Sequence, residues 1–248
     1  MTMKKSTSVK RTKQQKERII ISPSLLSSDF SCLASEVRRL RQAGCRWVHF
    51  DVMDGHFVPN LTFGAPIVAA VRPVSKALFF DVHLMIDDPM YYAPHFIKAG
   101  ADLITFHLEV VDNADKLIRL LHRNNVMAGI ALKPKTGIDV VEPWLSRIDV
   151  VMIMSVEPGF GGQKLIPSTL NKMRELRLLK EKHKHKFLIE IDGGIYDETA
   201  PLAVAAGADV LVAGSFIFGD RKISQNVQRL RAAAESAFTG DIHFKKTQ

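Results

Sequence analysis

Residues 47–60 read WVHFDVMDGHFVPN, and the alternation in their first half predicts the fold. Because side chains alternate along an extended strand, His49, Asp51 and Met53 point to one side, and the apolar residues between them point to the other. The apolar side suits packing against helices. A carboxylate on a buried strand must be paired, hydrogen-bonded or bound to a metal. We therefore expect a buried strand whose polar side belongs to a functional site.

Two later stretches repeat this alternation, FFDVHLM at residues 79–85 and FLIEIDGG at residues 187–194. The residues that share one side of these strands are Asp81, His83 and Met85 in the first and Glu190 and Asp192 in the second. Imidazoles and carboxylates on three strands are thus expected to face a common interior.

The composition is that of an ordinary globular protein, since 46% of the 248 residues are hydrophobic and 24% are charged. No apolar run approaches the ~20 residues that a membrane-spanning helix needs, so no membrane partner is expected. The two cysteines, Cys32 and Cys45, have no metal-binding or redox spacing. Such sparse cysteine usage is typical of a reducing compartment, and we expect a cytoplasmic protein.

Most of the positive charge lies at the N-terminus. Residues 1–18 hold seven Lys and Arg residues against one Glu, so they carry +6 of the net charge of +8. A polar segment without periodicity is expected to be a disordered, solvated extension. Contact with nucleic acid or another anionic surface and a targeting peptide are the alternatives. Neither is favoured, because no aromatic or groove-binding motif accompanies the charges and no apolar segment follows them directly.

From residue 19 onward, a short apolar strand followed by a helical segment recurs eight times. The expected strands are 19–21, 47–53, 77–84, 103–107, 127–132, 150–154, 187–191 and 210–213, and the expected helices are 29–43, 66–71, 90–99, 113–124, 140–145, 168–185, 198–206 and 223–237. Such alternation implies parallel strands with right-handed crossovers. It predicts an α/β fold, a single (β/α)8 TIM barrel over residues 19–238 with a C-terminal tail at 239–248. An open, doubly wound sheet is the alternative.

The polar residues lie near the carboxyl ends of their strands, where the sites of such barrels are found. His49, Asp51, His83 and Asp192 would form a good ligand set for one divalent metal ion per subunit. The mixture of imidazole and carboxylate leaves Zn, Fe, Mn, Co and Mg open. The alternative is a set of separately satisfied core polar groups. Glu190 is expected to support the ligands rather than join them, and His107 is a weaker ligand candidate.

Glycine-rich segments follow the last three expected strands and predict a phosphate site, because exposed backbone N–H groups form an anion-binding nest. These segments contain Gly159, Phe160, Gly161 and Gly162, then Gly193 and Gly194, and finally Gly214 and Ser215. Each glycine pair alone would pass as a turn. Three methionines, Met53, Met85 and Met154, end expected strands on the inward side. They are either core filler or a water-excluding lining over a reactive intermediate.

A metal, two carboxylates and a phosphate site together predict proton transfer next to a carbonyl group. The metal would hold the carbonyl and neighbouring hydroxyl oxygens and stabilise an enediolate. Asp51 and Asp192 are the pair expected to remove a proton from one face and return one to the other. Such a reaction inverts the carbon, so the predicted chemistry is epimerisation.

Several motifs together resemble those of the ribulose-phosphate 3-epimerase family, in the family's order and over residues 19–237. They are ISPSLLSSDF at residues 21–30, HFDVMDGHFVPN, DVHLM, MSVEPGFGGQ, IDGG and AGS. The resemblance implies a metal-dependent isomerase of the pentose phosphate pathway that interconverts D-ribulose 5-phosphate and D-xylulose 5-phosphate through a 2,3-enediolate. Ser22 and Ser28 stand where the family commonly has Ala, which removes no functional group. A homo-oligomer is expected, because members of the family often are.

The resemblance also implies residue roles. It assigns the metal to His49, Asp51, His83 and Asp192, and the acid and base to Asp51 and Asp192. The implied substrate contacts are Ser24, His83, Gly159, Phe160, Gly161, Gly162, Asp192, Gly193, Gly194, Gly214 and Ser215.

Three other functions compete with this one. The first is a 3-epimerase of a six-carbon ketose 6-phosphate of the allulose 6-phosphate type, which would use the same groups. The second is a phosphosugar aldolase or decarboxylase, which needs a Lys at a strand end, and Lys133 and Lys135 follow the fifth expected strand. The third is a non-catalytic phosphosugar or nucleic-acid binder that works through residues 1–18, and the intact ligand positions argue against it.

Overall fold

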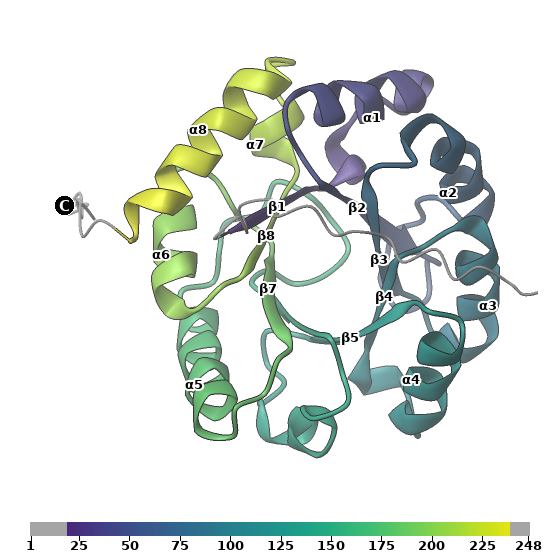
Figure 1. The fold of residues 1–248 in the computed structure, drawn as a ribbon, viewed down its shortest axis with the longest axis vertical. Coiled ribbons are helices and arrows are strands. Elements are labelled where there is room, and N and C mark those ends of the chain that lie inside the picture. The colour runs from purple at the N-terminus through teal and green to yellow at the C-terminus, as the bar shows by residue number, and fades with distance from the viewer. Residues whose placement is uncertain (1–18, 239–248) are drawn as a thin grey trace, which may run out of the picture.

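Eight short strands form one parallel sheet in a computed structural model that describes residues 19–238. The strands are β1 (Ile20–Pro23), β2 (Trp47–Met53), β3 (Phe79–Met85), β4 (Leu103–His107), β5 (Met127–Leu132), β6 (Val150–Met154), β7 (Leu188–Asp192) and β8 (Val210–Ala213). Their order is β1-β8-β7-β6-β5-β4-β3-β2, and a parallel bridge between Ser24 and His49 joins the two ends (Figure 1). The predicted (β/α)8 barrel is confirmed, and an open sheet is excluded. The predicted tails at 1–18 and 239–248 lie outside the described residues.

Helices cover the outside of the barrel (Figure 1). They are α1 (Leu33–Gln42), α2 (Ala65–Val71), α3 (Pro89–Ala99), α4 (Ala114–Arg123), α5 (Thr169–Lys182), α6 (Ala200–Ala206), α7 (Ser215–Phe218) and α8 (Ile223–Ser236). Short 3-10 helices add η1 (Leu25–Ser27), η2 (Phe30–Cys32), η3 (Arg72–Ser75), η4 (Leu108–Val110) and η5 (Asp139–Trp144). The helices bury apolar stripes at helical spacing, as α4 does with Leu117, Ile118 and Leu121.

The structure corrects three details of the expected helices. Asp29 caps the 3-10 helix η2 by accepting a hydrogen bond from the backbone N–H of Ser31, and α1 begins only at Leu33. The segment expected as a helix at 140–145 is the 3-10 helix η5, in which Pro143 has no N–H to donate. The short helix α7 was not expected, because four residues are too few to show helical periodicity.

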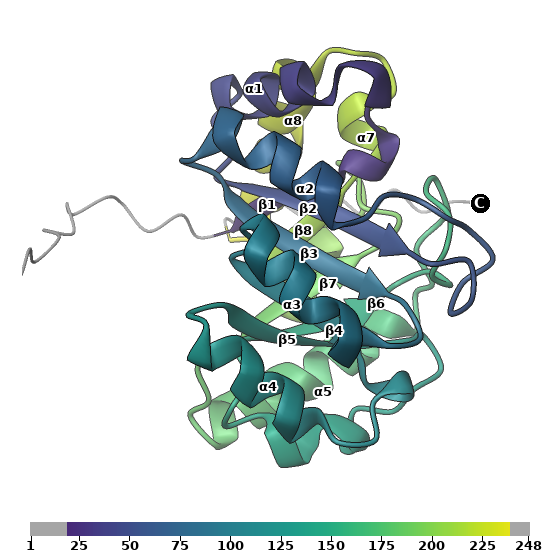
Figure 2. The same cartoon turned by 90° about the vertical axis from the view of Figure 1, so that its right-hand side faces the viewer.

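The interior of the barrel changes from apolar to polar along the strands. The layer at the amino ends is apolar and contains Trp47, Leu103, Val150 and Val210, one from every second strand. The strands β2 and β3 point toward the same side of the molecule, where long loops gather (Figure 2). The inward side chains nearer that side include His49, Asp51, His83 and Asp192, so the fold presents the functional groups toward the carboxyl ends of the strands.

Candidate active site

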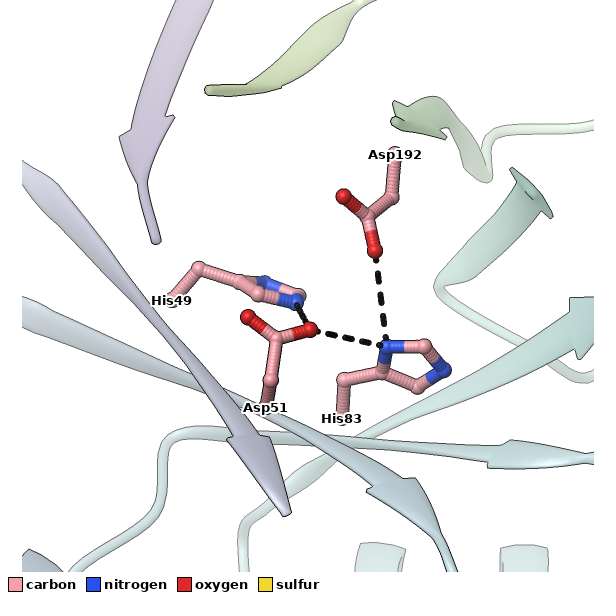
Figure 3. Close-up of side chains that lie close together, drawn as sticks. All are labelled: His49, Asp51, His83 and Asp192. Carbon is pink, nitrogen blue, oxygen red and sulfur yellow. Dashed lines mark ion pairs between the residues drawn. The ribbon is translucent and has the colours of Figure 1, made fainter. Parts of the chain in front are cut away.

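Four of the predicted site residues meet at the carboxyl ends of β2, β3 and β7 (Figure 3). One ligand atom from each of His49, Asp51, His83 and Asp192 lies within 4.8 Å of the others. His83 Nδ1 lies 3.6 Å from an oxygen of Asp51 and 3.7 Å from an oxygen of Asp192. His49 Nε2 lies 3.5 Å from the same Asp51 oxygen. The pleat places His49 and Asp51 on one side of β2, and the barrel brings Asp192 to them from the far side.

The hydrogen bonds of His49 leave one nitrogen facing this centre. His49 Nδ1 lies 2.6 Å from Asp81 Oδ2, and that oxygen also accepts a hydrogen bond from Ser22 Oγ at 3.1 Å. Asp81 therefore holds the proton on Nδ1. His49 Nε2 is buried with no hydrogen-bond partner among residues 19–238, and it faces the oxygen of Asp51. A cation ligated by this nitrogen would satisfy it.

His83 presents a second unpartnered nitrogen to the same place. Its Nε2 lies 2.9 Å from Nε2 of His107, whereas its Nδ1 has no hydrogen-bond partner within the described part of the chain. That Nδ1 faces the carboxylates of Asp51 and Asp192. Two buried imidazole nitrogens and two carboxylates without another donor between them fit a divalent transition metal. Their mixed character does not select one metal.

The two aspartates of the centre have opposite electrostatic environments. Burial alone would raise the pKa of Asp51, but the positive charge of His49 outweighs it and holds the pKa well below its ordinary value. Ser24 Oγ also donates a hydrogen bond of 2.5 Å to Asp51 Oδ2. Burial and the negative charge of Asp51 raise the pKa of Asp192 to about 7. At neutral pH one carboxyl is therefore ionised while the other readily holds a proton.

The histidines also differ in charge. Burial would lower the pKa of His49, but the charges of Asp81 and Asp51 raise it well above its ordinary value. Burial lowers the pKa of His83, which is therefore neutral. Burial likewise lowers the pKa of His107 to about 4. The proton on His49 is stabilised by the negative charge of the neighbouring carboxylates, which would also attract a bound cation.

Glu190 lies beneath the centre, in a second cluster with His49 and Asp81. Its side chain is buried, and neither oxygen has a hydrogen-bond partner among the described residues. Burial and the charge of Asp81 raise its pKa well above the ordinary value, so Glu190 is neutral. The His49 nitrogen that faces this cluster is already bound to Asp81. This second cluster therefore contacts His49 through Nδ1 and leaves Nε2 for the four-residue centre.

A pocket opens above the four-residue centre, and the segments predicted for substrate binding line it. The predicted residues in its wall are Ser24, Asp51, Met53, Met85, Met154, Gly159, Phe160, Gly161, Gly162, Asp192, Gly193, Gly194, Gly214 and Ser215. His49 and His83 are fully buried below it and are not in this wall. Lys133 and Lys135, the residues that an aldolase or decarboxylase would need, do not line it either.

The loop of residues 159–162 is held over the pocket by contacts from two directions. Asn60 Nδ2 donates a hydrogen bond of 2.7 Å to the carbonyl of Gly159. Gln163 Nε2 donates to the carbonyls of Glu157 and Phe160 at 2.7 and 2.9 Å. The Phe160 side chain is 56% exposed at the pocket wall. The loop is thus braced at its base while its aromatic tip is open to solvent.

Several residues with a part in the site were not assigned one from the sequence. Asp81 and Ser22 fix His49, and the single O–H of Ser155 is shared between the carbonyls of Asp192 and Gly193, which lie 2.8 and 2.5 Å from its Oγ. Asp81 carried a usable signal, because it lies two residues before His83 on the same inward face. Ser155 carried none, because a serine after a strand is common in loops.

Comparisons with known proteins agree on one family. A model of the ribulose-phosphate 3 epimerase family matches residues 20–218. The chain is 46% identical over 216 residues to ribulose-phosphate 3-epimerase of Bacillus subtilis, covering 87% of this chain and 99% of the relative. It is 42% identical over 221 residues to the cytoplasmic isoform of that enzyme from Oryza sativa, covering 88% and 95%.

Solved structures add a likeness of fold alone. The 3-hexulose-6-phosphate synthase from Salmonella typhimurium has a TM-score of 0.63 at 15% identity, covering 88% of this chain and 100% of that one. Within residues 19–238, no helix has the length and apolar character required to cross a membrane.

Proposed function

Because the chain belongs to the ribulose-phosphate 3-epimerase family, we propose that it interconverts D-ribulose 5-phosphate and D-xylulose 5-phosphate by proton transfer at carbon 3. The observation that carries this proposal is a pair of carboxyls in one pocket whose pKa values are pushed in opposite directions. The pKa of Asp51 lies well below its ordinary value, whereas that of Asp192 is raised to about 7. Titratable groups whose pKa values are pushed apart are suited to be acid and base.

Asp51 and Asp192 would act on opposite faces of carbon 3. The ionised carboxylate removes the proton from one face, and the protonated carboxyl returns a proton to the other, which inverts the carbon. The reverse reaction exchanges the two roles. The hydrogen bond from Ser24 to Asp51 supports this division, because it stabilises the ionised form of that carboxylate.

His49, Asp51, His83 and Asp192 would hold one divalent metal ion, whose identity among Zn, Fe, Mn, Co and Mg is open. When bound, the ion would supply positive charge that stabilises the enediolate oxygens of the substrate. The unpartnered nitrogens of His49 and His83 support this ligand set.

The remaining pocket residues would bind and enclose the substrate. Backbone N–H groups of the glycine segments at 159–162, 193–194 and 214–215 are suited to the phosphate group. Glycine is required at Gly193 and Gly194, where φ is 115° and 63°. Met53, Met85 and Met154 would exclude water from the intermediate. We further expect a cytoplasmic homo-oligomer, which sedimentation and cell fractionation would test.

Deuterium exchange at carbon 3 tests the proposal. Metal-replete protein in D₂O should place deuterium at carbon 3 of D-ribulose 5-phosphate and form D-xylulose 5-phosphate. Asp51→Asn and Asp192→Asn should each abolish epimerisation, and each should retain exchange only from the epimer whose proton the remaining carboxylate removes. The control is Asp197→Asn, because Asp197 forms a surface ion pair with Arg229 and should be dispensable.

Metal content is measured in each variant, so that loss of the ion is separated from loss of the acid or base. Absence of exchange with metal-loaded wild-type protein would refute the pentose assignment. A six-carbon ketose 6-phosphate would then be the next substrate to test.

A further inference from the structure

Hydrogen-bonded polar groups lead away from His83, through the buried His107 to Glu109, whose side chain is partly open to solvent. His83 Nε2 lies 2.9 Å from His107 Nε2, and His107 Nδ1 lies 3.2 Å from Glu109 Oε2. His107 ends β4 and Glu109 follows in η4, and neither lines the pocket. We propose that His107 and Glu109 are positioning residues that keep the Nδ1 lone pair of His83 directed at the metal centre. This inference rests on the proposed function, because it concerns the same metal site.

The direction of these hydrogen bonds follows from the other hydrogen-bond partners of Glu109. Glu109 Oε1 accepts hydrogen bonds from the backbone N–H of Lys133 at 2.8 Å and from Thr136 Oγ1 at 2.5 Å. These bonds, together with the one from His107, hold the pKa of Glu109 down to about 2 against the effect of burial, so Glu109 is ionised. An ionised carboxylate can only accept. Its second oxygen therefore receives the Nδ1–H of His107.

The proton positions on His107 and His83 then have one consistent arrangement. A neutral imidazole has one N–H and one lone pair, so a His107 that donates from Nδ1 must accept at Nε2. His83 is the donor, through its Nε2–H, and its Nδ1 is left without a proton. That nitrogen faces Asp51 and Asp192 at 3.6 and 3.7 Å. Glu109 thus determines, through His107, which nitrogen of His83 is free to bind a cation.

The surroundings exclude other partners for the contact between His83 and His107. His83 and His107 have no exposed surface. The ring of Phe57 covers His107 with 4.6 Å between the ring centroids. Lys133 Nζ lies 3.8 Å from the centre of the Phe57 ring and not at the carboxylate. Water cannot replace a donor or acceptor between His83 and His107 without opening the packing, so the position of the proton on His107 determines the position of the proton on His83.

Glu109→Gln is the most informative variant, because it keeps the shape and changes one oxygen to NH₂. The backbone N–H of Lys133 requires an acceptor, so the amide oxygen should face Lys133 and Thr136, and the NH₂ should face His107. His107 then accepts at Nδ1 and donates from Nε2, and His83 becomes protonated on Nδ1. Thr136→Val is the matched control, because it removes a hydrogen bond from the same carboxylate and leaves its bond to His107.

Two measurements test the inference. Nitrogen-15 spectra of the imidazole rings in the metal-free protein should show His83 protonated on Nε2 in the wild type and on Nδ1 in Glu109→Gln. Competition with a chelator should show a Zn²⁺ dissociation constant raised about 10- to 100-fold in Glu109→Gln, the usual effect of losing such a supporting contact. In Thr136→Val the rise should stay below about three-fold. Thermal unfolding of each metal-free variant checks that the fold is retained.

Unchanged His83 protonation and Zn²⁺ affinity in Glu109→Gln would overturn the inference. Should that variant not fold, His107→Gln and His107→Leu replace it. The amide oxygen of the first can still accept from His83, whereas the second cannot, so equal affinities would refute the inference. A wild-type protein that binds no divalent metal would instead refute the metal in the proposed function, and the nitrogen-15 spectra would still report on the hydrogen-bond chain.

Discussion

Metal binding should weaken steeply as the pH falls below about 7, because a cation must displace protons from two of its four ligands. In the metal-free protein, Asp192 holds a proton with a pKa of about 7. The charges of Asp81 and Asp51 overcome the effect of burial and raise the pKa of His49 well above its ordinary value, so it is protonated too. Asp51 and His83, whose pKa values are lowered, are already without the competing proton.

The size of the effect follows from this proton count. Between about pH 6 and pH 5, both Asp192 and His49 are almost fully protonated without metal. Each displaced proton then lowers the affinity about tenfold per pH unit, so two protons lower it about 100-fold. This corresponds to about 2.7 kcal/mol of binding free energy. Above pH 7 the Asp192 contribution disappears, and the slope should fall to about one proton.

Calorimetric titration with Zn²⁺ in two buffers of different ionisation enthalpy counts the protons released. Near pH 6 we expect about two protons per ion for the wild type and about one for Asp192→Asn. The surface variant Asp197→Asn should match the wild type. Release of less than one proton by the wild type, or an equal count in Asp192→Asn, would refute the protonation states assigned to the centre.

Two further predictions concern the pocket wall. Gly194→Ala should lower the free energy of unfolding by about 3 kcal/mol or more, because its φ is 63° and a Cβ would lie 2.3 Å from the backbone N of Leu165. Gly162→Ala, with φ of 76° but no atom within 4 Å of the added Cβ, should cost only about 1 kcal/mol in a denaturant titration, and an equal loss in both variants would contradict this reasoning. Ser24→Ala removes the hydrogen bond to Asp51 and should raise the pKa of the Asp51 carboxyl by about 1–2 units, measured from its carbon-13 shift in the metal-free protein, because hydrogen bonds to charged groups contribute about 1.5–3 kcal/mol. An unchanged pKa of Asp51 in Ser24→Ala would show that this bond does not hold Asp51 in its ionised form.

Much of the barrel could be predicted from the sequence because its signals are local. Alternation with a period of two is a property of the extended chain, so the sequence alone indicates that His49 and Asp51 share a side of β2. Segments of helical periodicity lie between the expected strands, and this alternation of strands and helices predicts the barrel. Local signals did not predict α7, which is only four residues long. They also placed the start of α1 too early, because Asp29 is the N-cap of the 3-10 helix η2.

The chemistry of the centre could be predicted only in part. The residue types indicated a metal and a pair of carboxyls, but nothing in the sequence separates Asp51 from Asp192 in pKa. That difference depends on contacts between strands, since Asp81 of β3 helps to keep His49 charged, the charge of His49 stabilises the ionised Asp51, and the negative charge of Asp51 raises the pKa of Asp192 on β7.

The sequence by itself determined which residues face the interior and at which end of each strand they lie. The tertiary structure decided which nitrogen of each histidine is free, because that depends on Asp81 for His49 and on His107 for His83. Both contacts join residues more than 20 positions apart in the chain. Hydrogen-bond direction and electrostatics depend on distance in space, and closure of the barrel is what sets those distances.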